Sequence, residues 1–246
     1  MRIAAISDIH GNLWALEAVL ADIARRGVEV TVNLGDILSG PLLPRQTADR
    51  LMDLNLPTIA GNHERQVLEQ EPGRMGESDL YACKQITSEQ RDWLSRLPKS
   101  LRVADDSVLL VHGTPDSDLI YFMETVTQQG TRAATQQEVQ ERAGNVAASL
   151  VLCGHTHLPR TMRLDDGRLI VNPGSVGLQA YDDEHPFFHK AENYTPHARY
   201  CIVERTGAMW TVEQYAVAYD WSSAAELAAI NNRPEWAHAL RTGRMP

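Results

Sequence analysis

The chain opens with the sequence RIAAISDIHGN at residues 2–12, a short apolar run that ends in an aspartate and a histidine. Residues 3–7 have the length and apolar character of a buried strand, and residues 13–26 repeat apolar side chains at helical spacing. A second, β-branched run follows at residues 28–34 and closes at Gly35. This order predicts a βαβ unit, in which a helix joins two parallel strands.

Further strands are predicted downstream of this unit. A helix at residues 47–54 precedes a third strand at residues 57–60. Parallel strands joined by right-handed crossovers end at the same edge of a sheet, where open α/β sheets bind ligands. We therefore expect Asp8, Asp36 and Asn62, which follow the three strands, to lie close together. Later apolar runs at residues 108–111 and 150–153 end at His112 and at the turn GHTH, which contains His155 and His157.

The residue types in this set suit a metal site. Aspartate, histidine and asparagine together favour divalent ions such as Mn, Fe, Zn or Ni. Asp36 has the central position, where one carboxylate can bridge two ions. The positive charge of two divalent ions exceeds the negative charge of two carboxylates and one bridging hydroxide. The positive charge that remains favours an anionic substrate. A metal-bridging hydroxide that attacks a phosphate ester in line is the expected chemistry.

Three residues beside these candidate ligands have expected supporting roles. His63 follows Asn62 directly and is not needed as a ligand, so we expect it to protonate the leaving group or stabilise its charge. Glu64 is expected to orient that imidazole. Asn12, like Glu64, is expected either to support the site or to contact the substrate.

The remainder of the chain changes character. Residues 160–172 and 198–216 each predict a hairpin, and antiparallel strands after parallel units suggest a second sheet packed on the first. Residues 116–148 are polar and rich in Gln and Glu, and we predict a helical excursion there. Residues 222–242 predict a helical tail with a break near residues 232–234.

Composition narrows the class of protein. The 246 residues are 43% hydrophobic and 22% charged, which is enough for one sizeable core and predicts a single domain. A formal charge of −9 disfavours stable binding to nucleic acid, because such binding relies on clustered Lys and Arg. Three dispersed cysteines favour a reducing cytoplasm, and we expect neither a signal peptide nor a membrane span.

Five motifs, taken in their order, resemble those of the calcineurin-like metallophosphoesterase superfamily. They are Asp8-x-His10, Gly35-Asp36, Gly61-Asn62-His63-Glu64, His112 and Gly154-His155-Thr156-His157. The resemblance covers residues 1–177 and implies an α/β fold in which two mixed β-sheets pack as a sandwich flanked by helices. Residues 172–177, NPGSVG, resemble the small bacterial and archaeal phosphodiesterase-like branch.

The resemblance also implies roles for single residues. His63 corresponds to the catalytic histidine of the family. The ligands of the first ion would be Asp8, His10, Asp36 and His157. The ligands of the second ion would be Asp36, Asn62, His112 and His155. A small phosphoester, with a nucleotide as one candidate, is the expected substrate.

Departures from the family pattern leave alternatives open. Residues 37–41, ILSGP, stand where protein phosphatases have Asp-Arg-Gly, which makes protein phosphatase activity less favoured. A phosphomonoesterase, a dinucleoside polyphosphate hydrolase and a metal-binding scaffold without turnover stay open. Residues 181–197 form an insertion beyond the minimal family pattern and could form a lid. The histidines of this segment lack the spacing of metal ligands, which favours a solvated loop. The rings of Tyr121 and Phe122 could stack on a nucleobase of the substrate, or they could pack within the protein as ordinary aromatic side chains do.

Overall fold

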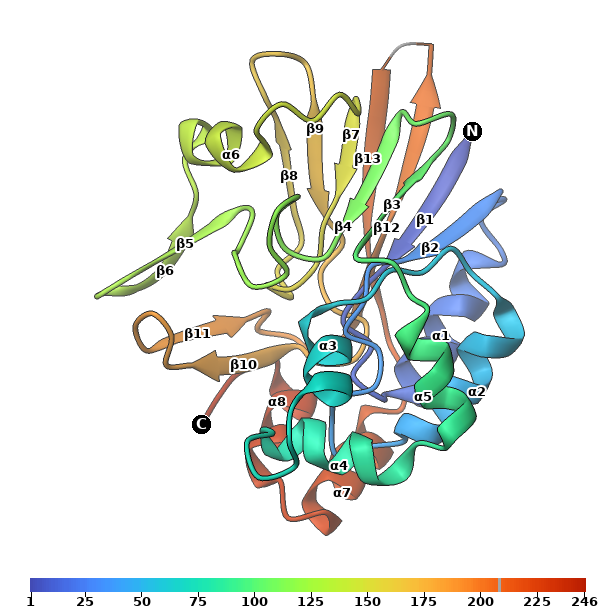
Figure 1. The fold of residues 1–246 in the computed structure, drawn as a ribbon, viewed down its shortest axis with the longest axis vertical. Coiled ribbons are helices and arrows are strands. Elements are labelled where there is room, and N and C mark those ends of the chain that lie inside the picture. Colours follow the sequence, from blue (N-terminus) through green and yellow to red (C-terminus); the bar gives the residue numbers. More distant parts are fainter. Residues whose placement is uncertain (208) are drawn as a thin grey trace.

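A computed structural model describes residues 1–207 and 209–246 of the protein, and two mixed β-sheets lie at its centre (Figure 1). The first sheet has the order β13-β12-β1-β2, formed by Met209–Val217, Ala198–Thr206, Arg2–Ile6 and Val30–Asn33. The second has the order β3-β4-β7-β9-β8, formed by Ser100–Val103, Val108–Val111, Leu150–Leu152, Leu169–Asn172 and Arg160–Arg163. The parallel pairing of β1 with β2 confirms the predicted βαβ unit.

The two sheets pack face to face through side chains that alternate along each strand. In β1, Ile3 and Ala5 lie in a core shared with Val108 of β4, whereas Ala4 and Ile6 lie in the core on the opposite face. All four β1 side chains are fully buried. Burial of a side chain as large as isoleucine stabilises the fold by about 1.5–3 kcal/mol. The apolar run that opens the chain is thus buried on both sides, as central parallel strands are.

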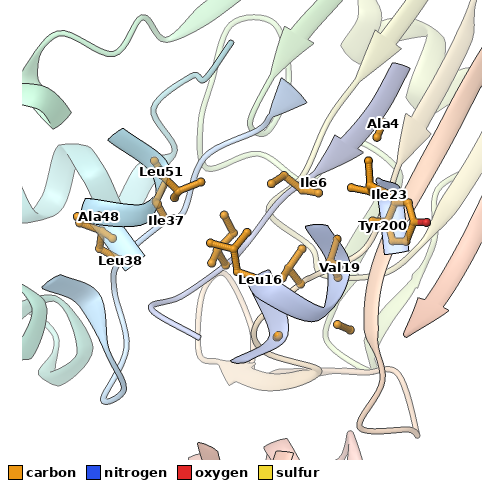
Figure 2. Packing of buried hydrophobic residues seen from close by; sticks show 14 of the residues in the cluster. Ala4, Ile6, Leu16, Val19, Ile23, Ile37, Leu38, Ala48, Leu51 and Tyr200 are labelled. Atoms are coloured by element: carbon orange, nitrogen blue, oxygen red, sulfur yellow. The ribbon is translucent and has the colours of Figure 1, made fainter. Parts of the chain in front are cut away.

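Helices cover the outer face of the first sheet. Helix α1 (Leu13–Ile23) directs Leu16 and Val19 toward Ile6 of β1, as Figure 2 shows. Near the end of α1, the Tyr200 hydroxyl donates a hydrogen bond of 2.6 Å to Asp22. Helix α2 (Pro44–Leu54) adds Ala48 and Leu51 to the same core. The regularly spaced apolar residues that predict these helices are the residues on their buried faces.

Short helices lie beyond the carboxyl ends of the strands (Figure 1). Helix α3 (Asn62–Glu69) begins at a candidate ligand, and α4 (Glu77–Gln85) and α5 (Ser88–Ser95) follow it. The tail forms α7 (Trp221–Ile230) and α8 (Pro234–Thr242), on either side of the predicted break. Within the described residues, no helix is long and apolar enough to cross a membrane.

Two predicted strand arrangements are wrong. Residues 57–60 form no strand and make a single parallel bridge, from Asn33 to Thr58. Pro57 has no N–H group, and Ala60 donates instead to Pro98, so the segment cannot continue a ladder. The hairpin of β12 and β13, which was predicted to belong to a second sheet, belongs to the first sheet instead. It pairs with β1 and so covers the edge that β1 would otherwise expose.

The predicted helical excursion at residues 116–148 is also wrong. It contains a hairpin of β5 (Glu124–Thr127) and β6 (Gly130–Ala133), and only α6 (Gln136–Ala143) is helical. The β-branched run Thr125-Val126-Thr127 favours a strand, and Gly130 has a φ of 109°, which suits the turn. The prediction was wrong because it relied on the Gln- and Glu-rich composition and overlooked this local strand signal.

The segment predicted as a lid also contains a hairpin. Strands β10 (Ala180–Asp183) and β11 (His189–Glu192) pair in an antiparallel register. In Figure 1 this hairpin and the β5–β6 hairpin project from the same side of the sandwich. Strand β11 packs against β6, and β10 packs against α8. These contacts hold the hairpin beside the carboxyl edge of both sheets.

Candidate metal centre

Loops at the carboxyl ends of the strands are tied to one another by backbone hydrogen bonds. The N–H group of Asp8 donates to Gly35 at 3.0 Å, and that of His10 donates to Asp36 at 3.1 Å. The N–H group of His155 reaches the side chain of Asp8 at 3.2 Å. Motifs that are almost 150 positions apart therefore meet at one place. The structure brings together all seven candidate ligands that the sequence predicts.

Five of these candidate ligands have an unusual backbone conformation. Asp8, His10, Asp36, His155 and His157 have φ angles between 51° and 70°. This left-handed region costs a residue with a side chain about 1 kcal/mol or more, and such conformations gather at functional sites. The surrounding fold holds the five residues there, and the turned backbone directs each side chain to the same centre.

One cluster consists of Asp8, His10 and His157, whose potential ligand atoms lie within 4.8 Å of one another. The Nδ1 atoms of the two rings are hydrogen-bonded to backbone carbonyls, that of His10 to Ser39 at 2.7 Å and that of His157 to Leu178 at 2.8 Å. Because each Nδ1 must donate, each Nε2 carries a lone pair. The two Nε2 atoms nevertheless face each other at 3.1 Å.

A proton does not easily bridge these two nitrogens. Burial and the nearby His63 lower the pKa of His10 to about 4. Burial and His10 lower the pKa of His157 well below its usual value. Both rings are thus neutral near pH 7, and burial raises the pKa of Asp8 to about 7. Facing lone pairs beside a buried carboxyl group fit a bound cation.

The second cluster consists of Asp36, His112 and His155. His112 donates through Nδ1 to the Leu34 carbonyl at 2.8 Å, and its Nε2 lies 2.9 Å from a carboxylate oxygen of Asp36. The side-chain amide of Asn62 lies beside the same Nε2, with its oxygen 3.1 Å away. An amide oxygen at this position is a neutral ligand of a kind that divalent ions accept.

The charge states in the second cluster differ from those in the first. Burial opposes charging of His112, but the Asp36 carboxylate outweighs it and raises the pKa of His112 to about 10. Burial and His112 lower the pKa of His155 to about 3. The carboxylate attraction that holds a proton on His112 would equally hold a divalent cation, which must displace that proton to bind. The donor set of both clusters therefore fits two divalent ions.

Glu64 does not orient His63, contrary to the sequence-based expectation. Its buried carboxylate accepts 2.8 Å hydrogen bonds from the backbone N–H groups of Asp36, Ile37 and Gly61. The last of these follows from its position in the first turn of α3, where a glutamate side chain reaches back to the residue that caps the helix. Glu64 thus fixes the loop that carries Asp36.

Asp79 orients His63 instead. An oxygen of its buried carboxylate lies 2.7 Å from His63 Nδ1, while His63 Nε2 lies 4.0 Å from Asp36. Burial opposes the charged imidazole, but Asp36 and Asp79 together raise the pKa of His63 to about 9. The protonated ring is therefore held with Nε2 free to donate. No motif marks Asp79 in the sequence, because it lies in the first turn of α4 and reaches His63 only through the tertiary fold.

Asn12 is held by contacts within the fold. Its side-chain oxygen accepts from Ala15 at 3.2 Å and caps α1, and its amide nitrogen donates to the Gly177 carbonyl at 2.9 Å. Asn12 is fully buried and is absent from the described residues that line the cavity. Both ends of the side chain are used by the fold, which agrees with the supporting role.

A cavity of about 800 Å³ opens over members of both clusters. Leu119, Ile120 and Tyr121 form one part of its wall, and Leu178 and Trp236 belong to another. This volume exceeds that of a phosphate ion several-fold and is in the range of pockets for small organic ligands.

The β10–β11 hairpin is joined to this wall by hydrogen bonds. Tyr181 donates to Tyr121 at 2.7 Å, and Tyr121 donates to His189 Nε2 at 2.8 Å. The prediction that the histidines of this segment are solvated is therefore wrong for His189, which is buried, whereas His185 is exposed. The rings of Tyr121 and His155 lie edge to face with centroids 5.0 Å apart. The hairpin thus contacts the second cluster through Tyr121, and the Tyr181 hydroxyl also donates to the His155 carbonyl at 3.4 Å.

Gly61→Ala is expected to lower the free energy of unfolding by about 1–3 kcal/mol, because an added methyl group overpacks the site. A Cβ atom at Gly61 would lie 2.2 Å from a carboxylate oxygen of Asp36, although the backbone conformation itself suits alanine. Urea unfolding measures the loss, and Gly73→Ala is the control because its Cβ would meet nothing within 4 Å. Equal unfolding midpoints for the two variants would contradict this account.

Comparisons with known proteins agree with this geometry. A family model for the calcineurin-like phosphoesterase superfamily domain matches residues 1–192. The uncharacterized protein MJ0912 of Methanocaldococcus jannaschii is 28% identical over 252 residues, which cover 95% of this chain and 94% of that protein.

Solved structures share the fold along the whole chain. A metallophosphoesterase from Sphaerobacter thermophilus is 25% identical with a TM-score of 0.73, and the match covers 98% of each chain. The hypothetical protein PH1004 from Pyrococcus horikoshii OT3 has a TM-score of 0.75 at 19% identity, over 100% of this chain and 99% of that one. The sequence motifs, the fold and the family match together show that this chain belongs to the calcineurin-like phosphoesterase superfamily.

Proposed function

We propose that this protein hydrolyses phosphate esters, phosphodiesters in preference to monoesters, with two divalent ions held by the two clusters. One observation carries the proposal: members of both clusters and His63 line a single cavity. When bound, such ions would polarise the phosphoryl oxygens and lower the pKa of a water molecule. Asp8, His10 and His157 would hold one ion, Asn62, His112 and His155 the other, and Asp36 would bridge them.

The side chains around the clusters supply the rest of the chemistry. His63 donates the proton that the leaving oxygen needs, because Asp79 fixes its Nδ1 and leaves Nε2 free. The carbonyls of Ser39, Leu34 and Leu178 hold the ligand imidazoles in the tautomer that offers Nε2 to a metal. The substrate therefore meets preorganised groups.

The size and the lining of the cavity support the proposed preference for diesters. A monoester has one organic substituent, whereas a diester needs space on two sides of the phosphorus atom. The lining of the cavity includes Tyr121 and Val126 from one stretch of the chain and Trp236 and Ala239 from another. Apolar and aromatic side chains in both parts suit organic substituents. A nucleotide diester is one substrate of this kind.

A phosphoester panel on protein loaded with Mn, Fe, Zn or Ni, with the bound metal quantified, tests the proposal. We expect about two ions per chain and a higher kcat/KM for bis(p-nitrophenyl) phosphate than for p-nitrophenyl phosphate. Faster monoester turnover would reverse the proposed preference, and faster cleavage of diadenosine tetraphosphate would favour a dinucleoside polyphosphate hydrolase. Two bound ions without turnover on any member of the panel would favour a scaffold.

A further inference from the structure

One cationic side chain in the cavity has no role in the chemistry described above. Arg233 precedes α8 and lines the same cavity as His10 and His63. Its side chain is only 16% exposed, which is unusual for an arginine. Burial of a guanidinium group at a cavity wall removes much of its hydration, and the carboxylates of Glu77 and Glu235 compensate part of that loss.

Several contacts fix the orientation of this guanidinium group. Nη1 donates to the Ser78 hydroxyl at 3.0 Å, and Nε lies 3.4 Å from Glu77 and also donates to Glu235. The central carbon lies 5.7 Å from the ring centroid of Trp236. Nη2 has no hydrogen-bond partner within residues 1–207 and 209–246. The group is thus held rigidly with one nitrogen unpaired.

These contacts place Arg233 beside the reacting groups but outside the metal clusters. Ser78, its hydroxyl partner, is the neighbour of Asp79, which holds His63. Trp236, on which it lies, packs edge to face on His10 with centroids 6.0 Å apart. Arg233 itself touches none of the candidate ligands among the described residues. An anion that it binds would therefore share one cavity with the scissile phosphoryl group.

We propose that Arg233 is a specificity-determining residue that binds a second anionic group of the substrate, a further phosphoryl group on the same molecule. This inference rests on the proposed phosphodiesterase function. Guanidinium groups bind phosphate through directed, charge-assisted hydrogen bonds. The indole of Trp236 and the small side chain of Ala239 continue the wall beside Arg233, so an organic group attached to that phosphate can pack there.

A matched pair of substrates tests the second phosphate directly. Thymidine 5′-(p-nitrophenyl phosphate) and its 3′-phosphorylated form share the scissile bond and the leaving group and differ by one phosphoryl group. For the parent protein we expect a KM at least about tenfold lower for the 3′-phosphorylated form. Arg233→Met should remove this preference and leave kcat and KM for the plain ester within twofold.

Two further variants control for folding and for general charge. Arg241→Met removes an exposed arginine from the same helix and should keep the preference. Arg233→Gln retains a donor toward Ser78 but loses the charge, so it should lose the preference even if the methionine variant folds poorly. An unchanged preference in Arg233→Gln, or a parent protein without preference, would overturn the inference while leaving the phosphodiesterase assignment intact. A parent protein that cleaves neither ester would remove both.

Discussion

Asp36→Asn is expected to reduce turnover of bis(p-nitrophenyl) phosphate by about a thousandfold or more in the presence of Mn²⁺. Asp36 lies 2.9 Å from His112 Nε2, and its other oxygen accepts from the His63 backbone at 3.0 Å. Loss of its charge would weaken both ion sites, and a metal ion supplies several kcal/mol of transition-state stabilisation. Asparagine has almost the same shape, so the fold should survive. Initial rates and the metal content of the purified variant measure the effect.

A surface aspartate provides the control for this substitution. Asp105 is exposed and has a φ of 51°, close to the 54° of Asp36, so Asp105→Asn changes charge in the same backbone conformation. We expect it to retain two ions and full activity. Undiminished turnover by Asp36→Asn would refute the metal-dependent assignment, because Asp36 is the carboxylate of the second cluster and the proposed bridge between the two ions.

His63→Ala is expected to lower kcat by about 10²–10⁴-fold, the range for loss of a general acid. The decrease should grow as the leaving group becomes more basic, because a poor leaving group depends more on the donated proton. Bound metal should stay at the parent level, since His63 belongs to neither cluster. A series of aryl and alkyl methyl phosphodiesters of graded leaving-group pKa measures this dependence.

Comparison with other variants separates proton donation from general damage to the site. Asp79→Asn should show a smaller decrease with the same trend, because the imidazole stays but loses the carboxylate 2.7 Å from Nδ1. His238→Ala removes an exposed histidine on α8 and should behave as the parent. A uniform decrease across the whole leaving-group series would show that His63 does not act on the leaving oxygen.

Much of the candidate metal centre could be predicted because its candidate ligands follow strands. An apolar run that ends in a polar residue, such as the one before Asp8, marks a strand end, and parallel strand ends share an edge. The predicted fold was least accurate where composition and local pattern disagree. Residues 116–148 contain a hairpin because Thr125-Val126-Thr127 favours extended backbone, which an average over Gln and Glu conceals.

Roles that depend on contacts between distant elements could not be predicted. Glu64 adjoins His63 in sequence, yet the first turn of α3 directs its carboxylate to backbone N–H groups. Asp79 is sixteen positions from His63 and reaches it only because α4 packs against α3. Adjacency along a helix is a poor guide to contact, since neighbouring side chains point in different directions.

By itself, the sequence determined the fold class, the set of candidate ligands and the candidate histidine beside it, because these follow from residue types at the ends of apolar runs. Only the tertiary structure decided which side chains act on which. It places the Asp79 carboxylate beside His63 and directs the Glu64 carboxylate to backbone N–H groups. It also places Arg233 in the wall of the cavity. The physical reason is that periodicity fixes which face of an element is buried, whereas partners on that face depend on how whole elements pack.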